Sequence, residues 1–173
     1  MAGDALMSYL LDQLERWVAS RREACVRPSR SEYFLAIAVL ASSRSTCARA
    51  ARGCVLVSRE GHVLATGYNG VPPSRSHCLQ DPGARCAGAD AASGQQLDQC
   101  DATHAEANAL VQCSESRRIA TCYSTVSPCV NCVKMLLATG CVTIVFRQAY
   151  ADEPTARALW LGNDSSREWI EIS

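Results

Sequence analysis

The chain has 173 residues, of which 48% are apolar, so it is long enough for one domain with a substantial hydrophobic core. Its 17 basic and 17 acidic residues leave a formal net charge of zero, whereas proteins that bind nucleic-acid backbones usually carry a basic excess. No apolar stretch reaches the length of a membrane span, and the first residues lack the basic region of a signal peptide. We therefore expect a cytoplasmic protein whose partners include neither a polynucleotide nor a membrane.

The apolar periodicity predicts helices that alternate with strands along the chain. An amphipathic helix ends before Pro28, and Ser31 caps the helix that follows. We assign residues 1–27 to an N-terminal helical extension and residues 28–173 to the main domain. The expected helices cover 5–24, 32–43, 104–113, 129–139 and 155–161, and the expected strands cover 53–58, 62–67, 121–125, 142–146 and 169–172. This alternation indicates an α/β sandwich with helices on both faces of a sheet.

Eleven cysteines are many for this length, and their number is odd. Without a secretory signal, such richness indicates metal ligands and buried thiols rather than a disulfide framework. Residues 69–101 show no periodicity, and a loop of that length inside a domain usually has something that organises it. A closed tetrahedral zinc site is one such organiser. Its candidate ligands are Cys47, Cys78, Cys86 and Cys100, with His77 as an alternative. Some of these residues remain candidates for free thiols, as we expect for Cys25, Cys54, Cys113, Cys122 and Cys141.

A His-x-Glu unit followed by a Pro-Cys-x-x-Cys unit is the pattern that indicates a catalytic site. Cys129 and Cys132 lie one helical turn apart and point their sulfurs the same way, and His104 from another helix completes three protein ligands. Three ligands leave the fourth position of a catalytic zinc for water, whose pKa the metal lowers towards neutrality. Glu106 can then move a proton from that water to a departing amine. The combination predicts a zinc-dependent hydrolytic deaminase.

Two alternatives explain parts of this pattern without catalysis. Thr103 and Glu106 fit an ordinary capping box, and a Cys-x-x-Cys pair also occurs in structural zinc knuckles and redox sites. Neither alternative accounts for both units together. We expect Thr103 and Ser127 to be the N-caps of the two helices, with Pro128 at a first helical position, so that the positive helix ends favour thiolates.

On these residues the chain resembles the deoxycytidylate (dCMP) deaminases, particularly their phage and bacterial branch, from about residue 28 to residue 150. The markers are Pro-Ser-x-x-Glu-Tyr-Phe at 28–34, Arg-Ser-Thr-Cys at 44–47, Gly-Tyr-Asn-Gly at 67–70, His-Cys at 77–78, Cys100, His-Ala-Glu-x-Asn-Ala at 104–109, Ser-Pro-Cys-x-x-Cys at 127–132 and Tyr150. The resemblance implies a cytidine-deaminase-like three-layer α/β/α sandwich with a mixed central sheet of about five strands. It also implies a homo-hexamer, in the host cytoplasm if a phage encodes the chain.

The activity implied by the resemblance is hydrolysis of dCMP to dUMP and ammonia, which supplies pyrimidine deoxynucleotides. Water attacks C4 of the cytosine, and Glu106 carries the protons. The implied substrate contacts are the Ala105 N–H to the pyrimidine O2, the Ser127 carbonyl to the amino group, Asn69 to the deoxyribose and Tyr150 as a cover. An arginine must meet the phosphate. We include Arg49 in the binding set, and the other candidates are Arg44, Arg117, Arg118 and Arg147.

The resemblance further implies the second, structural zinc at the four cysteines named above. It implies activation by dCTP and inhibition by dTTP, with Mg²⁺, at a separate site that includes Gly67, Tyr68 and Gly70. Arg52 departs from the family, which usually has an aliphatic residue there, and the helix before Pro28 is extra. Both departures can alter the allosteric site, the oligomer contacts or the tolerated base, so 5-methyl-dCMP and 5-hydroxymethyl-dCMP stay open as substrates.

Three rival hypotheses concern other zinc-binding proteins. A tRNA adenosine deaminase is disfavoured by the neutral charge, the Gly-Tyr-Asn-Gly segment and the cysteine-rich insertion. A free-nucleoside cytidine deaminase would resemble a Cys-Ala-Glu pattern with three thiolates. A non-catalytic zinc-binding protein on the same scaffold would need the metal ligands but not Glu106, which is intact.

Overall fold

The computed structural model describes residues 2–79, 83, 85–92, 94–96 and 99–173. It divides into two compact units, Met1–Arg30 and Ser31–Ser173. The helices are α1 (Ala2–Glu23), α2 (Arg30–Ser42), α3 (Ala105–Gln112), the short 3-10 helix η3 (Ser116–Arg118), α4 (Val130–Leu137) and α5 (Glu153–Leu161). The strands are β1 (Gly53–Ser58), β2 (Val63–Tyr68), β3 (Ile119–Ser124), β4 (Thr143–Phe146) and β5 (Glu168–Glu171).

The five strands form one mixed sheet in the order β2-β1-β3-β4-β5. β1 is antiparallel to both of its neighbours, β2 and β3, whereas β3, β4 and β5 run parallel to one another. The parallel strands are joined through α4 and α5, as parallel connections require a crossover. These observations confirm the mixed five-stranded sheet expected from the resemblance.

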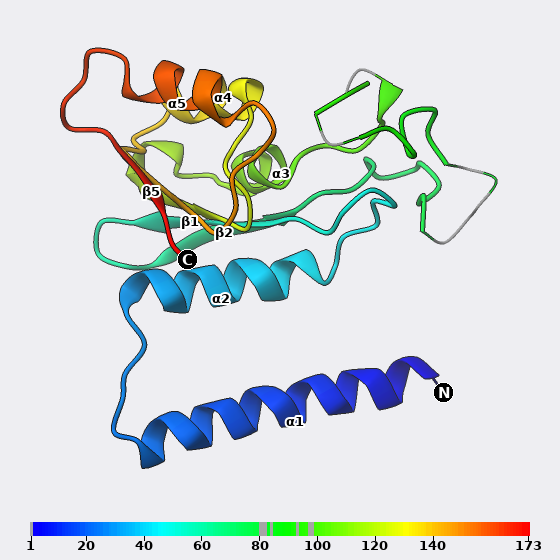
Figure 1. Cartoon of the computed structure of the whole chain (residues 1–173), viewed down its shortest axis with the longest axis vertical. Coiled ribbons are helices and arrows are strands. Elements are labelled where there is room, and N and C mark those ends of the chain that lie inside the picture. The colour runs from blue at the N-terminus through cyan, green and yellow to red at the C-terminus, as the bar shows by residue number, and fades with distance from the viewer. Residues whose placement is uncertain (1, 80–82, 84, 93, 97–98) are drawn as a thin grey trace. The chain divides into compact units, whose positions relative to one another are not determined.

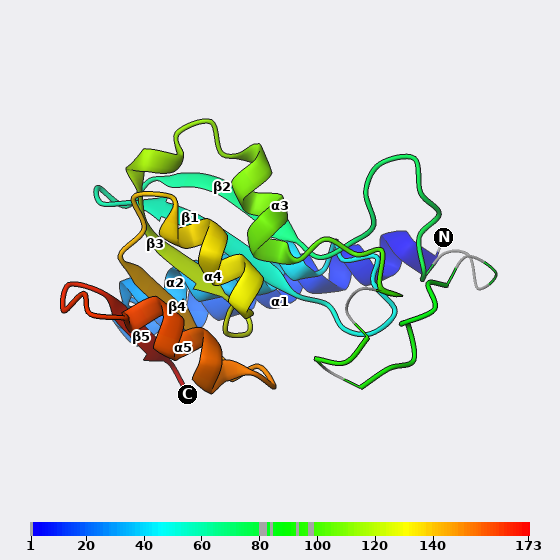
Figure 2. The ribbon, with the colours of Figure 1, turned by 90° about the horizontal axis from the view of Figure 1, so that it is seen from above.

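Helices cover both faces of the sheet (Figures 1 and 2). On one face, Phe34, Leu35 and Ala38 of α2 pack with alternate strand residues that include Val55 and Val57. On the other face, α3, α4 and α5 pack over Cys54, Leu56, Cys122, Ile144 and Phe146. Successive residues of a strand point to opposite faces, and β1 is buried along its whole length because both faces are covered. The three-layer α/β/α sandwich is therefore confirmed.

Two glycines allow helices to approach the sheet closely. A Cβ at Gly53 would lie 1.9 Å from the Ala38 carbonyl oxygen of α2. A Cβ at Gly67 would lie 2.2 Å from the carbonyl oxygen of Ala105, the first residue of α3. Any larger residue at either position would push the helix away from the sheet. The end of β2 is thereby held directly against the start of α3, which carries part of the site described below.

The N-terminal unit contains one long helix. After α1 ends, Cys25 adopts a left-handed backbone with φ 52°, and the Val26 N–H donates to the Arg21 carbonyl at 3.0 Å. This turn ends the helix before Pro28, as expected from the sequence. Within the described ranges, no helix is both long and apolar enough to cross a lipid bilayer. The assignment of residues 1–27 as an extension and 28–173 as the catalytic domain stays a proposal.

Candidate active site

Three metal-ligating side chains converge where α3 and α4 begin. His104 is the N-cap of α3, Cys129 is the N-cap of α4, and Cys132 lies in the first turn of α4. The His104 Nδ1 atom lies 3.3 Å from the Cys129 Sγ and 3.6 Å from the Cys132 Sγ. A tetrahedral zinc with ordinary bond lengths would hold nitrogen and sulfur about 3.6 Å apart. Among the residues that the structure describes, only this group brings three such ligand atoms within 4.8 Å of one another, so the expected ligand set fits zinc.

The electrostatics of the group prepare it for a metal cation. Hydrogen bonding from Cys132, supported by His104, lowers the pKa of Cys129 to about 4 despite partial burial. The hydrogen bond with Cys129 raises the pKa of His104, while the hydrogen bond with Cys129 and burial raise the pKa of Cys132. One thiolate is thus already present at neutral pH. Binding of zinc would displace the Cys132 thiol proton and any proton on the His104 Nδ1, and this binding weakens as the pH falls because the ligands must be deprotonated.

Glu106 lies beside the three ligands in the first turn of α3. It is only 6% exposed, and its Oε1 accepts a hydrogen bond of 2.7 Å from the Ser124 hydroxyl at the end of β3. The carboxylate also has a hydrogen bond with the Cys132 thiol, which ligation of zinc by the Cys132 thiolate would release. A buried carboxylate whose orientation is fixed by the Ser124 hydroxyl is suited to proton transfer.

The expected helix caps were wrong at both helices, and Ser31, expected to cap the helix after Pro28, lies inside α2. Thr103 forms a β-bridge with Gly70, with backbone hydrogen bonds of 2.9 and 3.2 Å, so the helix begins one residue later. Neither helix has a side-chain cap hydrogen bond, which also removes the capping-box explanation for Glu106. The Ser127 hydroxyl accepts from the Tyr150 N–H at 2.8 Å instead, and Pro128 precedes the N-cap. Both metal-binding residues at the caps therefore lie nearer the positive helix ends than expected.

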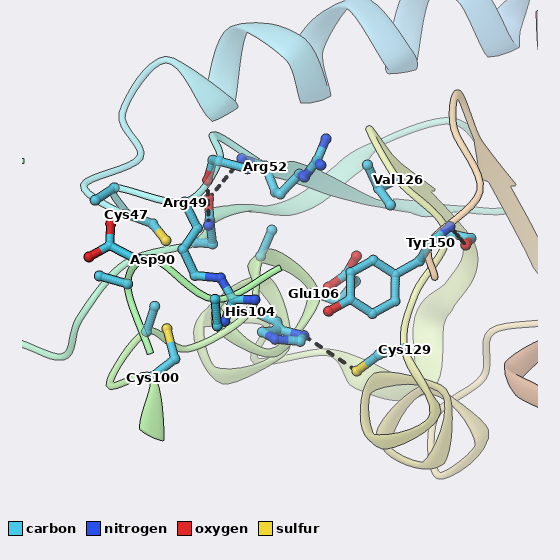
Figure 3. Close-up of a pocket in the computed structure, with 18 of the residues that line it drawn as sticks. Cys47, Arg49, Arg52, Asp90, Cys100, His104, Glu106, Val126, Cys129 and Tyr150 are labelled. Carbon is cyan, nitrogen blue, oxygen red and sulfur yellow. Dashed lines mark hydrogen bonds between the residues drawn. The ribbon is translucent and has the colours of Figure 1, made fainter. Parts of the chain in front are cut away.

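A cavity of about 390 Å³ opens onto the metal ligands (Figure 3). This volume lies in the range of sites for small organic ligands. The expected site residues that line it are Cys47, Arg49, Asn69, Cys100, His104, Ala105, Glu106, Ser127, Cys129 and Tyr150. The expected residues outside its lining are His77, Cys78, Cys86, Cys132 and the segment Gly67, Tyr68 and Gly70. The structure thus brings the catalytic and substrate-binding candidates together around one space.

Asn69 is held by its neighbours at the end of β2. Its Oδ1 accepts from the Ser45 hydroxyl and from the Arg52 N–H, both at 2.7 Å, and its Nδ2 donates to the Ala50 carbonyl at 2.8 Å. These bonds fix the side chain at the cavity wall and leave one hydrogen of the amide available. Asn69 therefore also organises the loop that precedes β1, which the sequence did not indicate.

The arginines divide clearly by position. Of the five phosphate candidates, Arg49 lines the cavity, whereas Arg44, Arg117, Arg118 and Arg147 do not. Arg118 pairs with Glu115 at 2.8 Å in the turn before β3. Two cavity arginines were missed as binding candidates: Arg52, which had been noted only as a departure from the family, and Arg85, which pairs with Asp90 at 2.6 Å. The feature of the sequence that could have identified Arg52 is its charge at a position where the family usually has an aliphatic residue.

The four cysteines expected at the second zinc do not form a close group of ligand atoms in the described part of the chain. Cys78 and Cys86 come within 4.0 Å, sulfur to sulfur. Cys47 and Cys100 line the cavity on the side away from Tyr150 (Figure 3). Among the described residues, the buried Nδ1 of His77 has no hydrogen-bond partner. The structural zinc therefore stays a prediction.

The family model for the cytidine and deoxycytidylate deaminase zinc-binding region matches residues 28–148. The chain belongs to this family. A deoxycytidylate deaminase of Mycobacterium phage D29 is 41% identical over 126 residues, which cover 69% of this chain and 95% of that protein. The deoxycytidylate deaminase of Saccharomyces cerevisiae is 37% identical over 153 residues, 87% of this chain and 46% of that protein. This chain thus spans about half the length of the yeast relative.

The fold is shared with solved structures of the family. A dCMP deaminase of the cyanophage S-TIM5, crystallised in complex with dCMP and dUMP, superposes with a TM-score of 0.63 at 26% identity. The match covers 85% of this chain and 99% of the cyanophage chain. The two proteins therefore share nearly all of the sandwich described above.

Proposed function

We propose that this protein catalyses the zinc-dependent hydrolysis of dCMP to dUMP and ammonia, a step that supplies pyrimidine deoxynucleotides. The observation that carries the proposal is the position of Glu106 beside His104, Cys129 and Cys132 on the wall of a 390 Å³ cavity. The cavity volume suits a mononucleotide, and relatives named as deoxycytidylate deaminases match most of the chain. The cyanophage relative crystallised with both dCMP and dUMP supports the same substrate and product.

The three ligands would hold the zinc and leave one position open, and a bound zinc would supply a water of near-neutral pKa. Glu106 takes a proton from the attacking water and delivers it to the ring during attack on C4. The same carboxylate then takes the proton of the new C4 hydroxyl and gives it to the departing amine, so that the C4 carbonyl forms, the C4–N bond breaks and ammonia leaves. The Ser124 hydroxyl holds one carboxylate oxygen in place throughout, as the 2.7 Å hydrogen bond supports.

The substrate contacts follow from the cavity lining. The Ala105 N–H is proposed to bind the pyrimidine O2, and the Ser127 carbonyl to accept from the amino group. Asn69 is proposed to bind the deoxyribose with its remaining amide hydrogen, and Tyr150 to cover the substrate. Arg49, on the wall beside the metal ligands, is proposed to be a further substrate-binding residue. All five residues line the same cavity, which supports these roles.

The pyrimidine specificity can be tested with a panel of nucleotides. We propose that dCMP is the preferred substrate and that 5-methyl-dCMP and 5-hydroxymethyl-dCMP are accepted more slowly. Chromatography of the products, with dCTP, deoxycytidine and adenosine in tRNA as comparisons, would give kcat/KM for each. Faster turnover of tRNA adenosine or of deoxycytidine than of dCMP would overturn the nucleotide assignment.

We propose a second, structural zinc at Cys47, Cys78, Cys86 and Cys100, with His77 as an alternative ligand. The 4.0 Å separation of Cys78 and Cys86 and the unpartnered His77 Nδ1 support it. Metal analysis of the purified protein should then give two zinc ions per chain, and Cys86→Ser should reduce this to one without removing the catalytic zinc. A wild-type value of one would reject the structural site.

We further propose that dCTP activates and dTTP inhibits the enzyme, with Mg²⁺, at Gly67, Tyr68 and Gly70. The close contact between Gly67 and the start of α3, and the 2.7 Å hydrogen bond from Asn108 to the Tyr68 carbonyl, support coupling to Glu106. Measurements of the rate against dCMP concentration with each effector would test this regulation, and unchanged curves would reject it.

A homo-hexamer in the cytoplasm is also proposed, and light scattering would give the mass of the assembly.

A further inference from the structure

We propose that Arg52 binds the 5′-phosphate of the nucleotide and so selects phosphorylated substrates over nucleosides. The inference rests on the proposed function, because it names the group that recognises the anionic end of dCMP. It assigns a role to the residue at which this chain carries a charge where the resemblance led us to expect an aliphatic side chain. A guanidinium is well suited to phosphate because it can offer two parallel N–H donors.

Three arginines line the cavity, and two of them are already engaged by the protein. Arg85 pairs with Asp90 at 2.6 Å, which neutralises its charge locally. The Nη2 atom of Arg49 donates to the backbone carbonyls of Ala92 and, at 3.1 Å, Gln95. Through these bonds, Arg49 holds the cysteine-rich segment against the site.

Arg52 is held much less firmly. Among the described residues, its guanidinium has one hydrogen bond, to the Gln148 Oε1 at 3.5 Å, which is at the limit for such a bond. A long bond to a neutral amide is readily exchanged for a short, charge-assisted bond to a phosphate oxygen. Arg52 is therefore the cavity cation with the most unused capacity for an anionic ligand.

The position of Arg52 also suits the end of the nucleotide that lies away from the metal. Arg49 is on the metal side: its charge acts on His104, and Figure 3 shows its guanidinium beside the His104 ring. In the same view Arg52 extends towards Val126, away from His104. If C4 of the base faces Glu106, the phosphate lies several bonds away, beyond the sugar. A cation next to His104 lies at the reacting end, whereas the Arg52 side chain extends away from His104, as a phosphate contact requires.

The backbone fixes Arg52 next to the proposed sugar contact. Its N–H donates to the Asn69 Oδ1 at 2.7 Å, and its carbonyl accepts from the Asn69 N–H at 3.1 Å. Its resting partner, Gln148, accepts the Ser127 N–H through its backbone carbonyl at 2.8 Å. Arg52 thus lies between Asn69, the proposed sugar contact, and the Gln148 segment that bonds to Ser127.

The test compares Arg52→Gln with the wild type on substrates with and without phosphate. We expect KM for dCMP to rise about ten- to a hundredfold, the effect of losing a charge-assisted hydrogen bond, with kcat changed by less than about threefold. We expect kcat/KM for deoxycytidine to stay within about threefold of the wild type. Arg52→Lys should recover part of the loss, because it restores the charge without the paired donors. Arg117→Gln is the control for the loss of one positive charge. Arg117 is exposed and lies just before β3, whereas Ser124 is at the other end of that strand.

Calorimetry can measure the binding of dUMP and of deoxyuridine to the zinc-loaded proteins. It tests the inference without relying on turnover. Weaker binding of dUMP, but not of deoxyuridine, to Arg52→Gln supports the phosphate contact. Equal binding of dUMP to both proteins overturns it, even if the wild type deaminates dCMP normally. Equal losses for the phosphorylated and unphosphorylated ligands also overturn it, because they indicate a structural defect. A wild type that neither binds dUMP nor deaminates dCMP would reject the proposed function, and this inference with it.

Discussion

Replacing Glu106 with Gln is expected to lower kcat for dCMP by about 10²–10⁴-fold, the usual contribution of a positioned proton carrier. The amide can still accept the 2.7 Å hydrogen bond from Ser124, so the side chain should keep its place. It cannot, however, take a proton from water or give one to the departing amine. Steady-state rates of dUMP formation would measure the loss.

The controls separate proton transfer from damage to the site. Zinc content should be unchanged in Glu106→Gln, because the carboxylate is not one of the three ligands. Ser124→Ala keeps the carboxylate but removes its neutral hydrogen-bond partner, and we expect a smaller loss, about two- to tenfold. Activity in Glu106→Gln close to that of the wild type would refute the assigned proton carrier.

Replacing Cys129 with Ser should remove the catalytic zinc and lower activity by more than about a hundredfold. Even the loss of a residue that only supports a ligand costs about ten- to a hundredfold in metal affinity, and loss of a ligand costs more. Cys129 is the thiol whose pKa is lowered to about 4, so it supplies the thiolate already present before the metal binds. Metal analysis and dCMP turnover on the same preparation would measure both effects.

Cys113→Ser is the matched control, since this half-buried thiol lies at the end of α3 and outside the ligand group. It should keep both its zinc and its activity. Full zinc occupancy in Cys129→Ser, with unchanged turnover, would show that the metal is held elsewhere. Loss of zinc from Cys113→Ser would point to unfolding rather than to the removal of a ligand.

The sequence indicated the sandwich and the metal ligands because both depend on local patterns. Period-two and helical spacing predicted the strands and helices to within a few residues, and the buried strand at 53–58 was found with its observed bounds. Cys129 and Cys132 are fixed relative to each other by one helical turn. The same local pattern predicted the start of α3 to within one residue.

Long-range contacts account for what the sequence did not indicate. Thr103 was expected to cap its helix, but its backbone bridges to Gly70, more than thirty residues away. Ser124 ends a strand like many other serines, and only the fold brings its hydroxyl to Glu106. Arg52 was visible as an unusual charge, yet its direction into the cavity depends on how β1 meets the Gln148 loop. The periodicity of a single chain carries no information on such pairings.

The formation of dUMP and ammonia from dCMP by the purified, zinc-loaded protein tests the central claim most directly. We expect equal amounts of the two products, loss of turnover after a chelator removes the metal, and recovery when zinc is restored. A folded protein that carries zinc at His104, Cys129 and Cys132 but forms no dUMP from dCMP would contradict the account.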